Sequence, residues 1–174
     1  MVPAILILTL AWSLKAMTGS LGAREFVAGV VKASAGGFKA FLPAIVFVIA
    51  CLLSFATGTS WGTFGILIPI TLSVFPLTDP LGVVSVSACM AGAVFGDHCS
   101  PISDTTIMAS AGAQCDHVTH VSTQLPYACV AAAVSFVTYI FAGFVPNALI
   151  ALPVGIVLML VTLLGLHKWH KEKA

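Results

Sequence analysis

The sequence is poor in charged residues, which make up only 7% of its 174 positions. Soluble domains carry about a quarter of their residues as charges. Apolar residues make up 59% of this chain, so several of its helices would have no polar face to turn toward water. The composition therefore excludes an ordinary soluble domain. With a net charge of only +1, we also expect no nucleic-acid partner.

The sequence also lacks the signs of a signal peptide and of a disulfide framework. No basic segment precedes the first apolar run and no convincing cleavage pattern follows it, so we expect residues 2 to about 17 to be a retained membrane helix and not a signal peptide. The five cysteines are an odd number, scattered mostly through apolar runs, and predict no disulfide framework: Cys51, Cys89, Cys99, Cys115 and Cys129.

What the chain does have is long apolar runs. Residues 126–145 and 148–167 each approach the roughly 20 residues that cross a bilayer, and a tight turn at Pro146 and Asn147 joins them. We predict an all-α integral membrane protein with a single membrane domain over residues 1–174. An interfacial helix is expected near residues 24–34. The basic tail with Trp169 predicts a cytoplasmic C-terminus in a multi-pass protein of the cell (cytoplasmic) membrane.

Residues 41–75 predict a re-entrant hairpin. Two apolar limbs flank the polar stretch TGTSWGT at 57–63. A single helix over this range would be roughly 52 Å long, whereas the hydrocarbon core is only about 30 Å thick. Two limbs of about 15 residues fit better, and Pro69 is expected to kink the second limb.

Residues 81–112 predict a broken helix. An apolar segment at 81–95 is followed by GDHCSPISDTT at 96–106, and a second short helix is expected from about Ser103 to Ala111. Gly96 and Pro101 are expected to end one helix and start the next, which places Asp97 just past the carbonyl end of the first.

Non-helical backbone at membrane depth is tolerated only when it is buried in protein or lines a wet cavity. A pair of interrupted apolar segments is the usual sequence pointer to a transporter's site. The oxygen-rich side chains and bared carbonyls at both breaks suit Na⁺, Li⁺ or H⁺ better than soft metals. Expected ion- or substrate-binding residues are Thr57, Gly58, Thr59, Ser60, Asp97, Ser100, Ser103, Asp104, Thr105 and Thr106. No resident cofactor or metal is expected beyond Na⁺ and H⁺ as cargo.

Each assignment has a simpler structural alternative. The aspartates, serines and threonines at the breaks are typical helix caps. His98 is either a proton carrier, because its pKa range suits physiological pH, or a hydrogen-bond partner. Cys115, His117 and His120 match no closed zinc pattern. Asp116, His117 and His120 are expected to face water at the membrane surface. The Ser, His and Asp residues fit no nucleophile elbow, so no enzyme is predicted.

Two segments, FATGTSWGTFGILIPI and GDHCSPISDTTIMASAGAQCDHVTHVSTQLPYA, resemble the signature of the NhaC-type sodium/proton antiporter family, within the wider ion-transporter superfamily. The resemblance runs from about Ala4 to Phe144 and matches the C-terminal half of an inverted-repeat transporter. It implies Na⁺/H⁺ exchange across the cytoplasmic membrane, or exchange of small organic acids such as malate and lactate. A truncated, non-transporting membrane subunit stays an alternative. The partners implied are the lipid bilayer and either a missing N-terminal half or another copy of the chain.

Overall fold

The computed structural model describes residues 39–173, and before them residues 5, 6, 9, 10, 13, 16, 17, 20–22 and 29. Described residues between 5 and 20 are helical, as expected for the first predicted helix. The predicted interfacial helix at 24–34 lies outside the described residues, except for Gly29. Residues 39–173 form a short 3₁₀ helix, η1 (Lys39–Phe41), and six α-helices: α3 (Leu42–Thr57), α4 (Ser60–Val74), α5 (Pro80–Cys99), α6 (Asp104–Gly112), α7 (His117–Phe144) and α8 (Ala148–Lys173).

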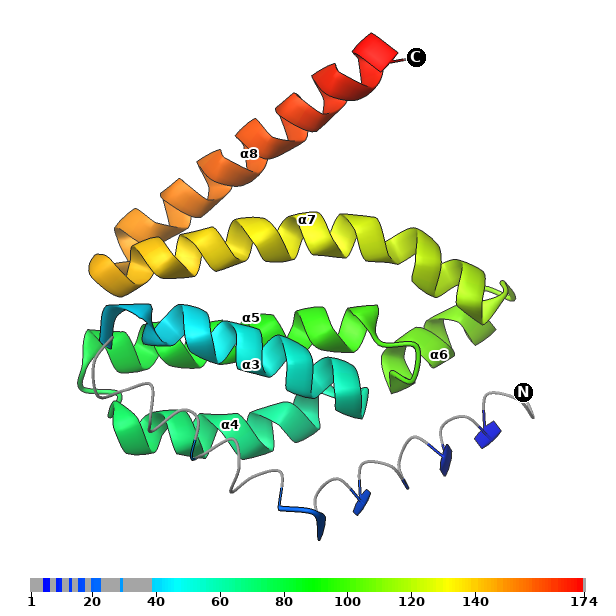
Figure 1. The fold of residues 1–174 in the computed structure, drawn as a ribbon, viewed down its shortest axis with the longest axis horizontal. Helices are drawn as coiled ribbons and strands as arrows, with labels where there is room; N and C mark the ends of the chain where they lie inside the picture. Colours follow the sequence, from blue (N-terminus) through cyan, green and yellow to red (C-terminus); the bar gives the residue numbers. More distant parts are fainter. Residues whose placement is uncertain are drawn as a thin grey trace.

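The helices from α3 to α7 form a packed unit, and α8 diverges from it (Figure 1). The hairpin of α3 and α4 turns back at Gly58 and Thr59, and α5 then runs alongside α3. α7 packs against α3 and α5. The all-α membrane fold predicted from composition is therefore confirmed, and the described part of the chain contains no strand.

The tightest packing joins α3 to α5. A methyl group on Gly92 would overlap the carbonyl oxygen of Phe47, and one on Gly96 would overlap that of Cys51. The Ser54 hydroxyl donates to the Ala93 carbonyl over 2.6 Å. Apolar burial does not favour helix association within lipid, so close backbone approach at small residues and interhelical hydrogen bonds supply the attraction. The parallel pairing of α3 and α5 follows from this contact.

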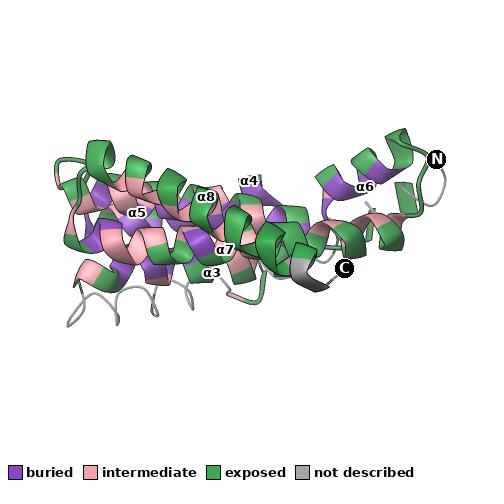
Figure 2. Ribbon diagram, turned by 90° about the horizontal axis from the view of Figure 1, so that it is seen from above, coloured by how far each residue is buried: buried purple, intermediate pink, exposed green. Residues whose placement is uncertain are grey.

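Burial is concentrated in the same helices. The buried apolar cluster comes from α3, α4, α5 and the residue that follows α4: Leu42, Val46, Ala50, Leu67, Ile70, Phe75, Cys89 and Ala93. Figure 2 shows buried residues concentrated in α3, α4 and α5, whereas none of the described residues of α8 is buried. The core therefore holds the hairpin and the first half of the broken helix in a fixed relation.

Four helical segments are long and apolar enough to cross a membrane: Lys39–Thr57, Pro80–Cys99, His117–Phe144 and Ala148–Trp169. The last two cover the predicted spans, although α7 begins nine residues before the predicted 126, inside a stretch expected to be polar surface. α3 and α4 form the expected helix–turn–helix, and α4 is shorter than the four spans. Whether this hairpin is re-entrant stays a prediction.

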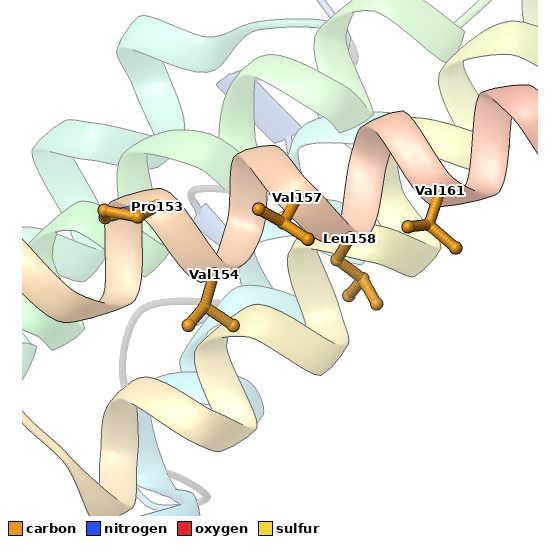
Figure 3. Close-up of a pocket in the computed structure, with 5 residues that line it drawn as sticks. All are labelled: Pro153, Val154, Val157, Leu158 and Val161. Carbon is orange, nitrogen blue, oxygen red and sulfur yellow. The ribbon is translucent and has the colours of Figure 1, made fainter.

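α8 offers an apolar surface and no polar site near its start. A hollow of about 350 Å³ is lined by Pro153, Val154, Val157, Leu158 and Val161. Figure 3 shows these side chains projecting from α8. A hollow lined only by carbon side chains offers no ligand to an ion.

One predicted boundary is wrong. α5 does not end at residue 95 but continues to Cys99, so Asp97 lies inside its last turn and not beyond it. Gly96 does not terminate the helix. Instead, its missing side chain makes room for the backbone of α3. Pro101 does follow the helix end, after Ser100 as the C-cap.

The α3–α5 contact generates a stability prediction. Gly92→Ala should destabilise the protein by about 1–3 kcal/mol, because the added methyl meets backbone that cannot yield. Gly65→Ala, on an exposed face of α4 with nothing within 4 Å, is the matched control and should be neutral or slightly stabilising. Thermal unfolding of both variants in mild detergent measures the difference. Equal midpoints would refute the packing argument.

Candidate functional site

The two breaks in the helices meet each other. Gly58 ends α3 in the left-handed conformation, with φ of 65°, and Thr59 caps the start of α4. A side chain on Gly58 would lie 2.6 Å from the carbonyl oxygen of Ile102, which lies in the break between α5 and α6. The hairpin tip and the helix break, predicted separately from sequence, are therefore parts of one junction.

Asp97 is the buried carboxylate of this junction. Its side chain is 3% exposed. The Ser60 hydroxyl donates to Oδ2 over 2.9 Å, and the Ser103 hydroxyl donates to Oδ1 over 2.6 Å. One donor comes from the hairpin and the other from the helix break. The carboxylate therefore ties the two breaks together.

The hydrogen-bond chain continues outward from Ser103. Its oxygen lies 2.8 Å from Oγ1 of Thr105 and also accepts from the backbone N–H of Thr106. A serine hydroxyl has one hydrogen. Because Ser103 gives that hydrogen to Asp97, Thr105 must be the donor in their contact. Thr105 is exposed, so a directed chain of hydroxyls leads from the surface to the buried carboxylate.

No described positive side chain neutralises Asp97. Within the described ranges no Lys or Arg forms an ion pair, and no group of three His, Cys, Asp or Glu residues is placed to hold a metal. A charge at the middle of a membrane costs roughly 2.5–3.5 kcal/mol by insertion scales. Two hydroxyl donors offset part of this cost. A hard monovalent cation or a proton would remove the charge itself.

The other predicted residues divide into three groups. Ser100 donates to the carbonyl of Phe55 over 2.7 Å and so fastens the break to α3. Thr57 donates to the Leu53 carbonyl within α3, and Thr59 caps the start of α4. Both bonds are local, and a role of these residues in ion binding stays a prediction. Asp104 is half-buried at the start of α6 and makes no hydrogen bond through its carboxylate with the described residues.

His98 lies apart from Asp97 although it is the next residue. It is exposed, and its Nδ1 donates to the Val94 carbonyl over 3.0 Å. Its side chain lines a largely apolar groove of about 780 Å³ between α5 and α7, together with Ser87 and Tyr139. No hydrogen bond links it to Asp97 in the described structure. Its role as proton carrier stays a prediction.

His117 departs from its predicted surroundings. It was expected to face water, but it is half-buried, and both of its ring nitrogens are engaged by Pro101 and Ser110. No sequence signal marks this contact, which joins residues 16 positions apart. Asp116 is exposed as expected and caps α7. The backbone N–H and hydroxyl of Thr119 and the nearby His117 hold the pKa of Asp116 below its ordinary value.

A multi-pass helical protein with a buried, unpaired carboxylate where two helix breaks meet has the architecture of a secondary transporter. Comparison with known families agrees. Residues 1–144 match the model of the Na⁺/H⁺ antiporter family, and the chain belongs to that family. The narrower NhaC-type assignment is not confirmed by this match.

Three relatives illustrate the similarity. An uncharacterised protein of Haemophilus influenzae is 42% identical over 95% of this chain and 32% of its own length. A malate-2H⁺/Na⁺-lactate antiporter of Bacillus subtilis is 33% identical over 56% of this chain and 21% of its own. An uncharacterised Na⁺/H⁺ antiporter of H. influenzae is 40% identical over 49% and 19%. The chain thus spans a third or less of each relative. No solved structure matches it.

The geometry predicts that the buried hydroxyls support cation binding. The purified wild-type chain should unfold at a higher temperature in NaCl than in choline chloride, because a ligand of the folded state stabilises it. Ser60→Ala removes a donor to Asp97. The variant should need about ten times more NaCl than the wild type for the same rise in unfolding temperature. Thr57→Ser, which keeps a purely local bond, is the control. Equal sodium responses in the wild type and in Ser60→Ala would contradict the prediction.

Proposed function

We propose that this chain carries the cation site of a Na⁺/H⁺ exchanger and that Asp97 is the carboxylate shared by the two ions. The single observation that supports this is the placement of Asp97. It is a buried acid that has no positive partner in the described part of the chain, and it accepts a bond from one hydroxyl of each helix break. Helix breaks that face each other across a membrane protein are where carriers hold their cargo.

The exchange follows from charge balance at one carboxylate. Either Na⁺ or H⁺ neutralises Asp97, and neutralisation removes the cost of carrying a charge through the bilayer. The hydroxyls of Ser60 and Ser103 donate to the bare carboxylate. When Na⁺ is bound, they rotate to offer oxygen lone pairs instead. Because one ion excludes the other, inward movement of a proton is coupled to outward movement of sodium.

Exchange of organic acids is the second candidate. The observation in its favour is the 33% identity to the malate-2H⁺/Na⁺-lactate antiporter of B. subtilis. The same sodium and proton site at Asp97 would serve both functions. Assays with and without malate and lactate separate them, because a simple cation exchanger needs neither acid.

Neutralising the carboxylate tests the proposal. Asp97→Asn should abolish Na⁺-dependent proton flux, because an amide neither carries a charge nor takes up a proton. Flux is measured with a pH-sensitive dye in inverted vesicles that hold the chain together with an N-terminal half from a relative. Asp79→Asn is the matched control. It caps the other end of α5, its side chain bonds only to the Leu81 N–H among the described residues, and Asn is an equally good cap.

Asp104→Asn belongs in the same experiment. The sequence placed Asp104 in the site, whereas its half-buried carboxylate makes no bond there. Loss of flux in Asp104→Asn as well as in Asp97→Asn would support two carboxylates at the site. Normal flux and normal pH dependence in Asp97→Asn would refute the role given to Asp97.

We further propose that this chain acts with a second membrane body, either an N-terminal half or another copy of itself. This proposal is supported by the small share of each relative that the chain spans. The relatives are at least three times as long as the segment they share with the chain. An inverted-repeat carrier closes its site by setting one repeat against the other. The basic end of α8 favours a cytoplasmic C-terminus in the cytoplasmic membrane.

The partner proposal predicts an inactive chain when it is alone. Proteoliposomes holding only this chain as a monomer should show no sodium/proton exchange, because one repeat cannot seal both sides of a midplane site. Co-reconstitution with an N-terminal half taken from a relative, or self-association seen by light scattering, should accompany activity. Exchange by a monodisperse single chain would rule the proposal out.

A further inference from the structure

The break between α5 and α6 has only four residues, and each of them contacts a different part of the molecule. Ser100 is fastened to the end of α3 and Ser103 to Asp97 on α5. The Ile102 carbonyl lies against Gly58 at the hairpin tip. These three contacts each involve a residue that the sequence analysis predicts to lie at a break.

The fourth fastening comes from outside the breaks. The carbonyl oxygen of Pro101 accepts a hydrogen bond over 2.7 Å from Nε2 of His117, in the first turn of α7. Proline leaves this segment without a backbone N–H of its own at that position. The His117 bond is the contact by which α7 holds the middle of the break.

The ring is fixed at its other nitrogen too. Nδ1 lies 3.0 Å from the hydroxyl of Ser110, which also donates to the Ile107 carbonyl within α6. A carbonyl oxygen only accepts, so Nε2 must carry a hydrogen in the Pro101 bond. Both the neutral Nε2–H tautomer and the imidazolium satisfy that requirement. The Pro101 bond is therefore compatible with both forms of the ring. The single hydrogen of Ser110 points to the Ile107 carbonyl when Nδ1 donates, and it must leave that carbonyl for Nδ1 when the ring is neutral.

We propose that His117 is a positioning residue for the cation site: by holding Pro101 it keeps Ser103 two residues later within reach of Asp97. The inference rests on the proposed function, since it assumes that the Asp97 site binds the transported ion. His117 does not touch the ion. It sets the geometry of one of the two hydroxyls that do, and so controls how tightly Na⁺ is held.

Two amides of different length make the test specific. In His117→Gln the side-chain nitrogen reaches the position of Nε2 and can still donate to Pro101. In His117→Asn it reaches only the position of Nδ1, so the Pro101 bond is lost. His120, one turn along α7 and half-buried like His117, has no side-chain hydrogen bond in the described structure, and His120→Asn is the control.

The first measurement needs no transport. Amide hydrogen exchange of the full chain in detergent should show residues 100–106 exchanging about tenfold faster in His117→Asn than in the wild type, His117→Gln or His120→Asn. Unchanged exchange in His117→Asn would overturn the positioning role even if sodium transport proves real.

The second measurement uses sodium-dependent proton flux in vesicles. His117→Asn should raise the sodium concentration for half-maximal rate about tenfold and leave the maximal rate within about twofold, and His117→Gln should restore the wild-type value. A fall in maximal rate without a change in half-saturation would contradict the inference. The vesicles hold the chain together with an N-terminal half from a relative. If no variant transports there and hydrogen exchange still separates Asn from Gln, the positioning contact stands and the proposed function fails.

Discussion

The structure is organised around a buried carboxylate that has no counter-ion among the described residues. Asp97 lies buried in the last turn of α5, and its two oxygens are held by hydroxyls from two separate interruptions of the helical fold. Those hydroxyls can reach it only because α3 and α5 approach closely at Gly92 and Gly96, which brings the hairpin tip to the helix break. The close packing of α3 against α5 therefore places both hydroxyls within reach of the carboxylate. A looser pair of helices would leave the acid exposed to lipid or to water.

Much of this arrangement could be predicted from the sequence. Apolar runs are long and charges are few, so the membrane helices can be predicted from composition. Gly58 and Pro101 mark places where a helix cannot continue, and clusters of Ser and Thr around them signal backbone groups that need partners. The contact between Ser60 and Asp97 brings the two predicted breaks together, and their binding of an ion stays a prediction. Membership of the Na⁺/H⁺ antiporter family agrees with the broader part of the resemblance, whereas the NhaC-type assignment is not confirmed.

The remaining features depend on contacts between distant residues. Gly96 was interpreted as a helix end, because glycine ends helices more often than it packs them, and only the position of Cys51 reveals its role. His117 looked like a surface residue because its neighbours are polar. Its bond to Pro101 exists because the nine-residue α6 is short enough to bring the start of α7 back to the break. Asp104, equally prominent in the sequence, lacks such a partner in the fold.

The line of hydroxyls from Thr105 through Ser103 to Asp97 has a direction, since every hydrogen in it points inward. Such a line can also point the other way. If the carboxylate acquires a proton, each hydroxyl can turn to donate outward, and the whole row reverses its polarity while all heavy atoms stay in place. A sodium ion, by contrast, has to displace the oxygens it passes. A proton can pass along the same few atoms by transfer from oxygen to oxygen, after which the hydroxyls rotate back, so in the proposed exchange the two ions need not travel by the same motion.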